Sequence, residues 1–126
     1  LMSLLLLLPM IFAPHHYEEF EGQLWTNDGE IPGNGIDDDG NGFVDDYNGL
    51  NAYNGDMADP VDGNGHGTHV AGIIAANADN HIGISGIAAN ARLMVLKAVD
   101  ASGHGNGSHI AAAIRYAVDK GARIIH

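Results

Sequence analysis

The sequence predicts an α/β protein whose parallel sheet carries helices on its faces. Leu93 to Leu96 is a short, continuous apolar run, typical of a buried parallel strand. Apolar residues then recur at helical spacing from Ile110 to Val118, and Ile124 with Ile125 begins another strand. Two parallel neighbours need a crossover connection, so this strand–helix–strand unit indicates a parallel sheet.

The ends of this helix have recognisable signals. Ser108 is expected to cap its first turn, because a serine oxygen accepts from the free backbone N–H groups there. Gly121 is expected to end it, because glycine adopts the left-handed conformation that follows a helix at little cost.

Another helix is predicted from Thr68 to Ala76. The run is apolar and small on nearly all sides, and such a helix is normally buried. Gly72 lies in its middle at a cost of about 1 kcal/mol relative to alanine. We therefore expect another backbone to approach the helix closely at Gly72.

His66 stands immediately before this run, among three glycines that predict a tight turn: Gly63, Gly65 and Gly67. The partial positive charge of a helix N-terminus disfavours the imidazolium, so a histidine there is suited to accept a proton as a general base. Two alternatives remain open at this point. His66 and His69 are simply polar residues at a helix start, or they share a metal ion with a third ligand.

The run His66-Gly67-Thr68-His69-Val70-Ala71-Gly72, continued by Ile73 to Ala76, resembles the active-site histidine motif of the subtilases, which are subtilisin-like serine proteases. The resemblance implies that His66 is the general base of a Ser-His-Asp triad and that His69 is a structural neighbour. It also implies a polypeptide substrate and a parallel sheet with helices on both faces, here incomplete.

An acidic stretch precedes the histidine motif and has the spacing of a calcium loop. It reads D-x-D-x-N-G-x-x-D, as at the start of an EF-hand loop. Asn48 replaces the glutamate of the twelfth position, and no amphipathic helices flank the loop, so an EF-hand pair is not expected. The predicted calcium ligands are Asp37, Asp39, Asn41, the Phe43 carbonyl and Asp45.

The alternative for this stretch is a solvated acidic loop without a metal. The wider segment 24–51 resembles an insertion that many subtilases carry upstream of the histidine motif. The loop after the Thr68–Ala76 helix resembles a second calcium-binding loop of the family, with Asn80, Ile82 and Ile84 as candidate ligands. In the same family, the segment that matches Gly103, His104 and Gly105 runs beside the substrate backbone, whereas His104 alone is as compatible with an exposed loop histidine.

Residues 1–14 form a separate apolar segment ahead of the predicted peptidase domain, residues 15–126. The segment is too short to cross a bilayer, which needs about 20 residues. It resembles the apolar part of a secretory signal peptide, so we expect a secreted protein, although a buried strand or a truncated start also fits.

Charge narrows the classes of partner. The formal net charge of −11 argues against nucleic acids and anionic membranes as partners and favours cations or basic ligands. The chain has no cysteine, so no disulfide is expected. Nothing in the sequence predicts an oligomeric state.

Two members of the expected triad are missing from their usual context. The region that should hold the Asp, residues 4–18, contains none, and no serine of the chain lies in a Gly-Thr-Ser motif. We therefore expect a central fragment of a subtilisin-like endopeptidase that is inactive by itself. The alternatives are a non-catalytic, calcium-binding descendant of the family and a metal hydrolase that uses His66 and His69.

Overall fold

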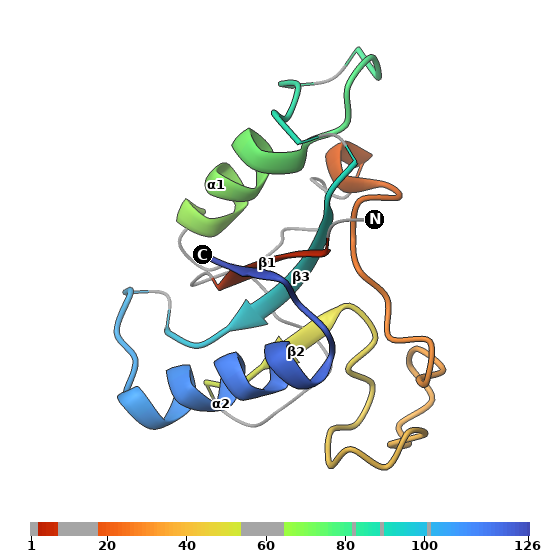
Figure 1. Ribbon diagram of the computed structural model, residues 1–126, viewed down its shortest axis with the longest axis vertical. Coiled ribbons are helices and arrows are strands. Elements are labelled where there is room, and N and C mark those ends of the chain that lie inside the picture. The colour runs from red at the N-terminus through yellow and green to blue at the C-terminus, as the bar shows by residue number, and fades with distance from the viewer. Residues whose placement is uncertain (1–2, 8–17, 54–64, 82, 89, 101) are drawn as a thin grey trace.

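A computed structural model describes residues 3–7, 18–53, 65–81, 83–88, 90–100 and 102–126 (Figure 1). It contains four strands and two helices among these residues. In chain order they are β1 (Ser3–Leu7), β2 (Gly49–Asn51), α1 (His66–Ala75), β3 (Arg92–Lys97), α2 (Gly107–Asp119) and β4 (Ile124–Ile125).

The four strands form one parallel sheet in the order β2-β3-β1-β4. β3 pairs with β1 from Ser3↔Arg92 to Leu7↔Leu96, and with β2 from Gly49↔Val95 to Asn51↔Lys97. Leu24 forms an isolated bridge to Leu93. Segment 24–51, predicted as an insertion, is therefore joined to the sheet at both of its ends.

β3 is the centre of the core because its two faces are covered by different helices. Leu93 and Val95 pack into one cluster with Ala71 and Ala75 of α1. Met94 and Leu96 point the other way, as alternation along a strand requires, and pack against α2. The predicted parallel sheet with helices on both faces is confirmed for the described residues (Figure 1).

One of the two strand–helix–strand connections is left-handed. Both β2→β3 and β3→β4 move in the same direction along the sheet, yet their helices lie on opposite faces. Two connections of the same hand and direction would place both helices on one face. Right-handed crossovers account for about 98% of such connections, so a left-handed one is a rare and distinctive feature of this topology.

α1 differs from its prediction in two respects. It begins at His66, and it buries one face rather than all sides: Ala71, Gly72 and Ala75 are buried, whereas Ile73 is 42% exposed. The neighbour of Gly72 is the side chain of Ile84, 3.5 Å from a Cβ built there, and no other backbone approaches it closely among the described residues. The expected backbone contact at Gly72 is therefore wrong.

α2 starts two residues earlier than predicted, and its cap is Asn106. The Asn106 side chain accepts from the His109 N–H at 3.0 Å, and the Ser108 hydroxyl donates to the same oxygen. The expected serine cap is thus replaced by an asparagine, the other residue type suited to this position. At the far end Gly121 has φ 84°, which confirms the predicted glycine stop.

The apolar N-terminal segment contributes a strand in the described part of its length. β1 lies inside the sheet, between β3 and β4, so the strand interpretation of residues 1–14 holds for Ser3–Leu7. Residues 1–2 and 8–14 lie outside the described residues, as do Ile82 and the glycine turn at Gly63. Within the described chain, neither helix has the length and apolar character needed to cross a membrane.

Gly86 offers a test of how the end of α1 is packed. The N–H groups of Gly86, Ile87 and Ala88 bond to carbonyls at the helix end, and a Cβ at Gly86 would lie 2.4 Å from the Ala76 nitrogen. We predict that Gly86→Ala lowers the free energy of unfolding by about 2–3 kcal/mol, measured by denaturant titration.

Gly107→Ala is the matched control for this test. A Cβ at Gly107 meets no atom within 4 Å, and the residue is helical, so the substitution should raise the unfolding free energy by about 0.5–1 kcal/mol. Equal effects of the two substitutions would contradict the packing described for Gly86.

Candidate active site and acidic loop

His66 is the first residue of α1 and is exposed. The preceding Gly65 is the N-cap residue, with φ 86°, and it makes no side-chain hydrogen bond to the helix. In a parallel sheet, the helix that follows a strand begins at the carboxyl edge. His66 therefore lies at that edge, where α/β proteins generally bind ligands (Figure 1).

The loop that contains Gly103, His104 and Gly105 lies at the same edge of the sheet, because it connects β3 to α2 (Figure 1). Asp100 organises it: its carboxylate accepts from the N–H groups of Ser102 and His104, both at 2.9 Å. The His104 N–H, more than that of Ser102, holds the pKa of Asp100 below its ordinary value.

This arrangement leaves the His104 side chain in solvent, with 84% of its surface exposed. Gly105 packs closely on the segment that follows β3, since a Cβ there would lie 2.6 Å from the Ala98 carbonyl oxygen. The backbone of the loop is thus fixed while its side chains are small or point outward. Such a segment can present backbone groups to an extended peptide.

The shared-metal alternative for His66 and His69 finds no support in the described chain. Both imidazoles are exposed, one turn apart on α1. Among the described residues, neither histidine belongs to a group of three that could hold a metal ion. The third ligand that this alternative requires is therefore absent from that part of the chain.

The acidic loop brings three carboxylates together. Ligand oxygens of Glu30, Asp37 and Asp39 all lie within 4.8 Å of one another. Two of these residues, Asp37 and Asp39, belong to the predicted calcium ligands. Hard cations such as calcium prefer carboxylate oxygens, so the donor set fits that ion.

The other predicted ligands have partners of their own. Asn41 turns its carbonyl oxygen to the Phe43 N–H at 2.8 Å, and Asp45 accepts from the N–H groups of Asn34 and Gly35. The Phe43 ring packs edge-on against Tyr116, with centroids 5.6 Å apart. These contacts fold the loop, and Asp45 is not part of the group of three carboxylates.

Glu30 is the residue that the sequence pattern missed. It is buried, at 5% exposure, and its two oxygens accept from the N–H groups of Asp38, Asp39 and Asp45. It precedes Asp37 by seven residues and lies outside the alternating motif. A single glutamate among polar residues carries no spacing signal, so only the folded loop shows its position.

Asp46 fixes the loop to the rest of the protein. Its side chain is fully buried and accepts from the side-chain amides of Asn27 and Asn41 and from the Tyr116 hydroxyl at 2.6 Å. Burial, followed by the hydrogen bond to Asp46, raises the pKa of the Tyr116 phenol. The hydroxyl therefore remains a donor throughout the ordinary pH range.

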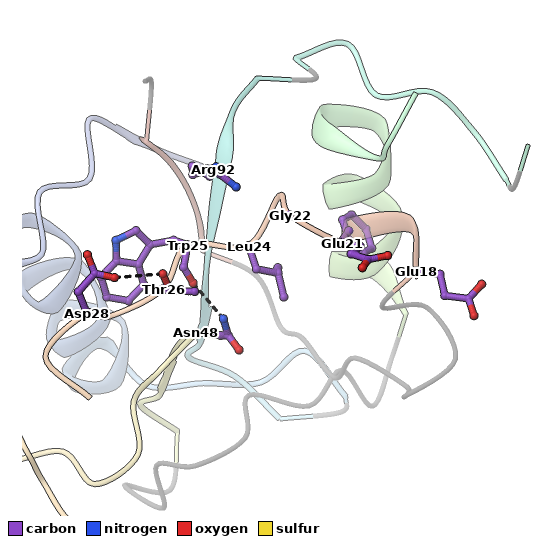
Figure 2. Close-up of a pocket in the computed structure, with 10 residues that line it drawn as sticks. Glu18, Glu21, Gly22, Leu24, Trp25, Thr26, Asp28, Asn48 and Arg92 are labelled. Carbon is purple, nitrogen blue, oxygen red and sulfur yellow. Dashed lines mark hydrogen bonds between the residues drawn. The ribbon is translucent and has the colours of Figure 1, made fainter. Parts of the chain in front are cut away.

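The surface of the described chain contains two recesses of interest. A recess of about 740 Å³ lies at the amino end of β3, lined by residues such as Leu24, Trp25 and Arg92 (Figure 2). It contains none of the predicted site residues. A smaller one of about 230 Å³ is lined by Asn80 and Ile84, two candidates for a second calcium loop. Ile82, the third candidate, lies outside the described residues.

Comparison with known families agrees with this arrangement. The sequence model of the Subtilase family matches residues 13–126, which includes the histidine motif, the acidic loop and both helices. The chain belongs to the subtilase family. A search of curated proteins found no match. Subtilases are serine peptidases, so this family implies a polypeptide substrate.

The buried Asp46 carboxylate can be tested directly. We predict that Asp46→Ala lowers the unfolding free energy by about 3 kcal/mol or more, because the buried Asn27 amide, the buried Tyr116 hydroxyl and the half-buried Asn41 amide all lose this acceptor. Tyr116→Phe removes one of the three and should cost about 1–2 kcal/mol. Asp119→Ala, an exposed carboxylate of α2, should change stability by less than about 0.5 kcal/mol.

These values are read from chemical denaturation followed by circular dichroism. An Asp46→Ala protein as stable as Asp119→Ala would show that the acidic loop is not anchored through this carboxylate.

Proposed function

We propose that this subtilase is a calcium-dependent serine endopeptidase and that His66 is its general base. The observation that carries the proposal is the His-Gly-Thr-His-Val-Ala-Gly run at the N-terminus of α1, on the carboxyl edge of the sheet. Family membership supports the same assignment.

In this mechanism His66 accepts the proton of a serine hydroxyl as that oxygen attacks the peptide carbonyl. The imidazolium then donates the proton to the leaving amine, and water later hydrolyses the acyl-enzyme by the reverse proton path. The serine of the triad would come from outside these 126 residues, whereas residues 4–18, where the orienting aspartate is expected, contain none. The 126-residue chain alone is then expected to hydrolyse no peptide.

The Gly103–Gly105 segment is proposed to hold the substrate backbone. Its fixed backbone and small or outward side chains leave room for an extended peptide on the His66 side of the sheet. Asp100 positions the segment through its two hydrogen bonds to the loop backbone.

Glu30, Asp37 and Asp39 would hold the calcium ion. When bound, calcium supplies positive charge that offsets the mutual repulsion of these carboxylates. Their remaining hydrogen bonds to loop N–H groups keep the three side chains directed inward. Because Ser3–Leu7 forms the inner strand β1, the apolar residues 1–14 fit a strand of the domain better than a cleaved secretory segment.

A second candidate is a non-catalytic family member that retains the acidic loop as a calcium-binding module. The hydrogen bonds within that loop favour this candidate, because they join residues of the loop to one another and not to His66. The complete coding sequence decides between the two. An Asp-Thr-Gly turn upstream and a Gly-Thr-Ser motif downstream would support the protease.

The catalytic assignment predicts a large effect at His66. In the protein expressed from its complete coding sequence, His66→Ala should lower kcat/KM for a peptide substrate by about 10⁴-fold or more. It should also abolish covalent labelling by a fluorophosphonate probe. His69→Ala, one turn along the same helix, is the matched control and should retain activity.

If His69→Ala also abolishes activity and the protein requires zinc, the metal-hydrolase alternative replaces the protease. If the 126-residue chain alone is labelled by the probe, the expectation that the triad is completed from elsewhere is wrong.

The calcium assignment predicts a stability effect. Chelation should lower the melting temperature of the complete protein, because a ligand that binds only the folded state stabilises it by an amount that rises with the logarithm of its concentration over Kd. Asp37→Asn should weaken calcium binding by about tenfold or more in isothermal titration. Asp28→Asn, an exposed carboxylate outside the three-residue group, should bind as the unmodified protein does.

A further inference from the structure

Lys120 joins the end of α2 to the acidic loop. Its Nζ lies 2.5 Å from Oδ2 of Asp39, although the two residues are 81 positions apart in the sequence. Within the described chain, it is the one lysine or arginine that forms an ion pair with the group of Glu30, Asp37 and Asp39.

The helix end fixes the position of this lysine. Lys120 is the C-cap residue of α2, and its N–H bonds to the Tyr116 carbonyl. The Gly121 N–H bonds to Val118 and the Ala122 N–H to Ala117, which is the Schellman arrangement. Nζ also lies 5.8 Å from the centroid of the Tyr116 ring, within reach of a cation–π contact.

The carboxylate that Lys120 contacts is shared by several donors. Oδ2 of Asp39 also accepts from the side-chain amides of Asn27 at 2.9 Å and Asn41 at 3.3 Å. Burial by itself raises the pKa of Asp39, but the hydrogen bonds from Lys120 and Asn27 outweigh it and hold that pKa below its ordinary value. Asp39 therefore remains a carboxylate beside the ammonium at neutral pH.

The other two carboxylates of the group have different partners. Glu30 accepts from three backbone N–H groups, and Asp37 accepts from the N–H groups of Asn41 and Gly42. These donors are neutral. Among the described residues, Lys120 is thus the side chain with a full positive charge that bonds to the group of Glu30, Asp37 and Asp39.

We propose that Lys120 is a built-in counter-ion of the acidic loop, which competes with a divalent cation for Asp39. Without the metal, the ammonium holds Asp39 against the end of α2. A bound calcium ion would attract the same Asp39 charge and so weaken its contact with Lys120. This inference rests on the proposed calcium site.

The argument is electrostatic. An ammonium near the metal position repels a divalent cation, and the repulsion is only partly screened at physiological ionic strength because the charges lie within one Debye length. Removing the ammonium should tighten calcium binding. It should also leave the metal-free loop less stable, because the ammonium no longer reduces the repulsion among the three carboxylates.

The test uses the protein expressed from its complete coding sequence, with Lys120→Met as the charge-free variant. We expect its Kd for calcium, measured by isothermal titration, to be about tenfold lower than that of the unmodified protein. Its melting temperature should be lower in EGTA, and the rise in melting temperature on adding calcium should be larger.

Two controls isolate the effect. Lys120→Arg keeps the charge and should bind calcium within about twofold of the unmodified protein. Arg115→Met removes a cation from the exposed surface of the same helix, so it reports the effect of net charge alone and should change Kd by less than about twofold.

The outcomes separate the two proposals. If the unmodified protein does not bind calcium, the calcium assignment fails and the competition fails with it. If it binds calcium but Lys120→Met binds with equal or lower affinity, only the competition is overturned. Lower stability in EGTA with an unchanged Kd likewise overturns it and leaves Lys120 as a simple surface ion pair.

Discussion

The fold depends on the burial of β3 on both faces. Its four central side chains alternate between two clusters, so each helix is held by a different pair: Leu93 and Val95 for α1, Met94 and Leu96 for α2. Both proposed elements of the active site are positioned by the N-terminal ends of these helices. His66 begins α1, and the Gly103–Gly105 loop leads into α2. A change in β3 would therefore displace both together.

The second constraint is the fully buried Asp46 carboxylate, which connects the acidic loop to α2 through Tyr116. A buried carboxylate requires several donors, and here Asn27 and Asn41 of the loop supply the others. The loop is consequently built around a charge that does not belong to the proposed metal group. The Asn27 and Asn41 amides also donate to Asp39, so the buried Asp46 and the proposed metal group share these two donors.

The sequence predicted what local periodicity determines. The strand at Leu93–Leu96, the helix ended by Gly121 and the exposed histidine at a helix start were all predicted, because each depends on neighbours within a few positions. Glu30 and Lys120 were not, since their contacts join distant segments whose pairing has no sequence period. The left-handed connection was equally inaccessible, because it depends on which face each helix covers.

The position of α2 also constrains what a bound cation can do. Lys120 and Tyr116 meet the acidic loop at one end of this 13-residue helix, and Asn106 caps the other end beside the proposed substrate loop. The two ends are about 20 Å apart. Between them Ala113 and Ala117 are fully buried against the β3 face, and a closely packed interface does not slide by small amounts. A cation in the loop would thus stabilise the domain rather than switch the substrate site.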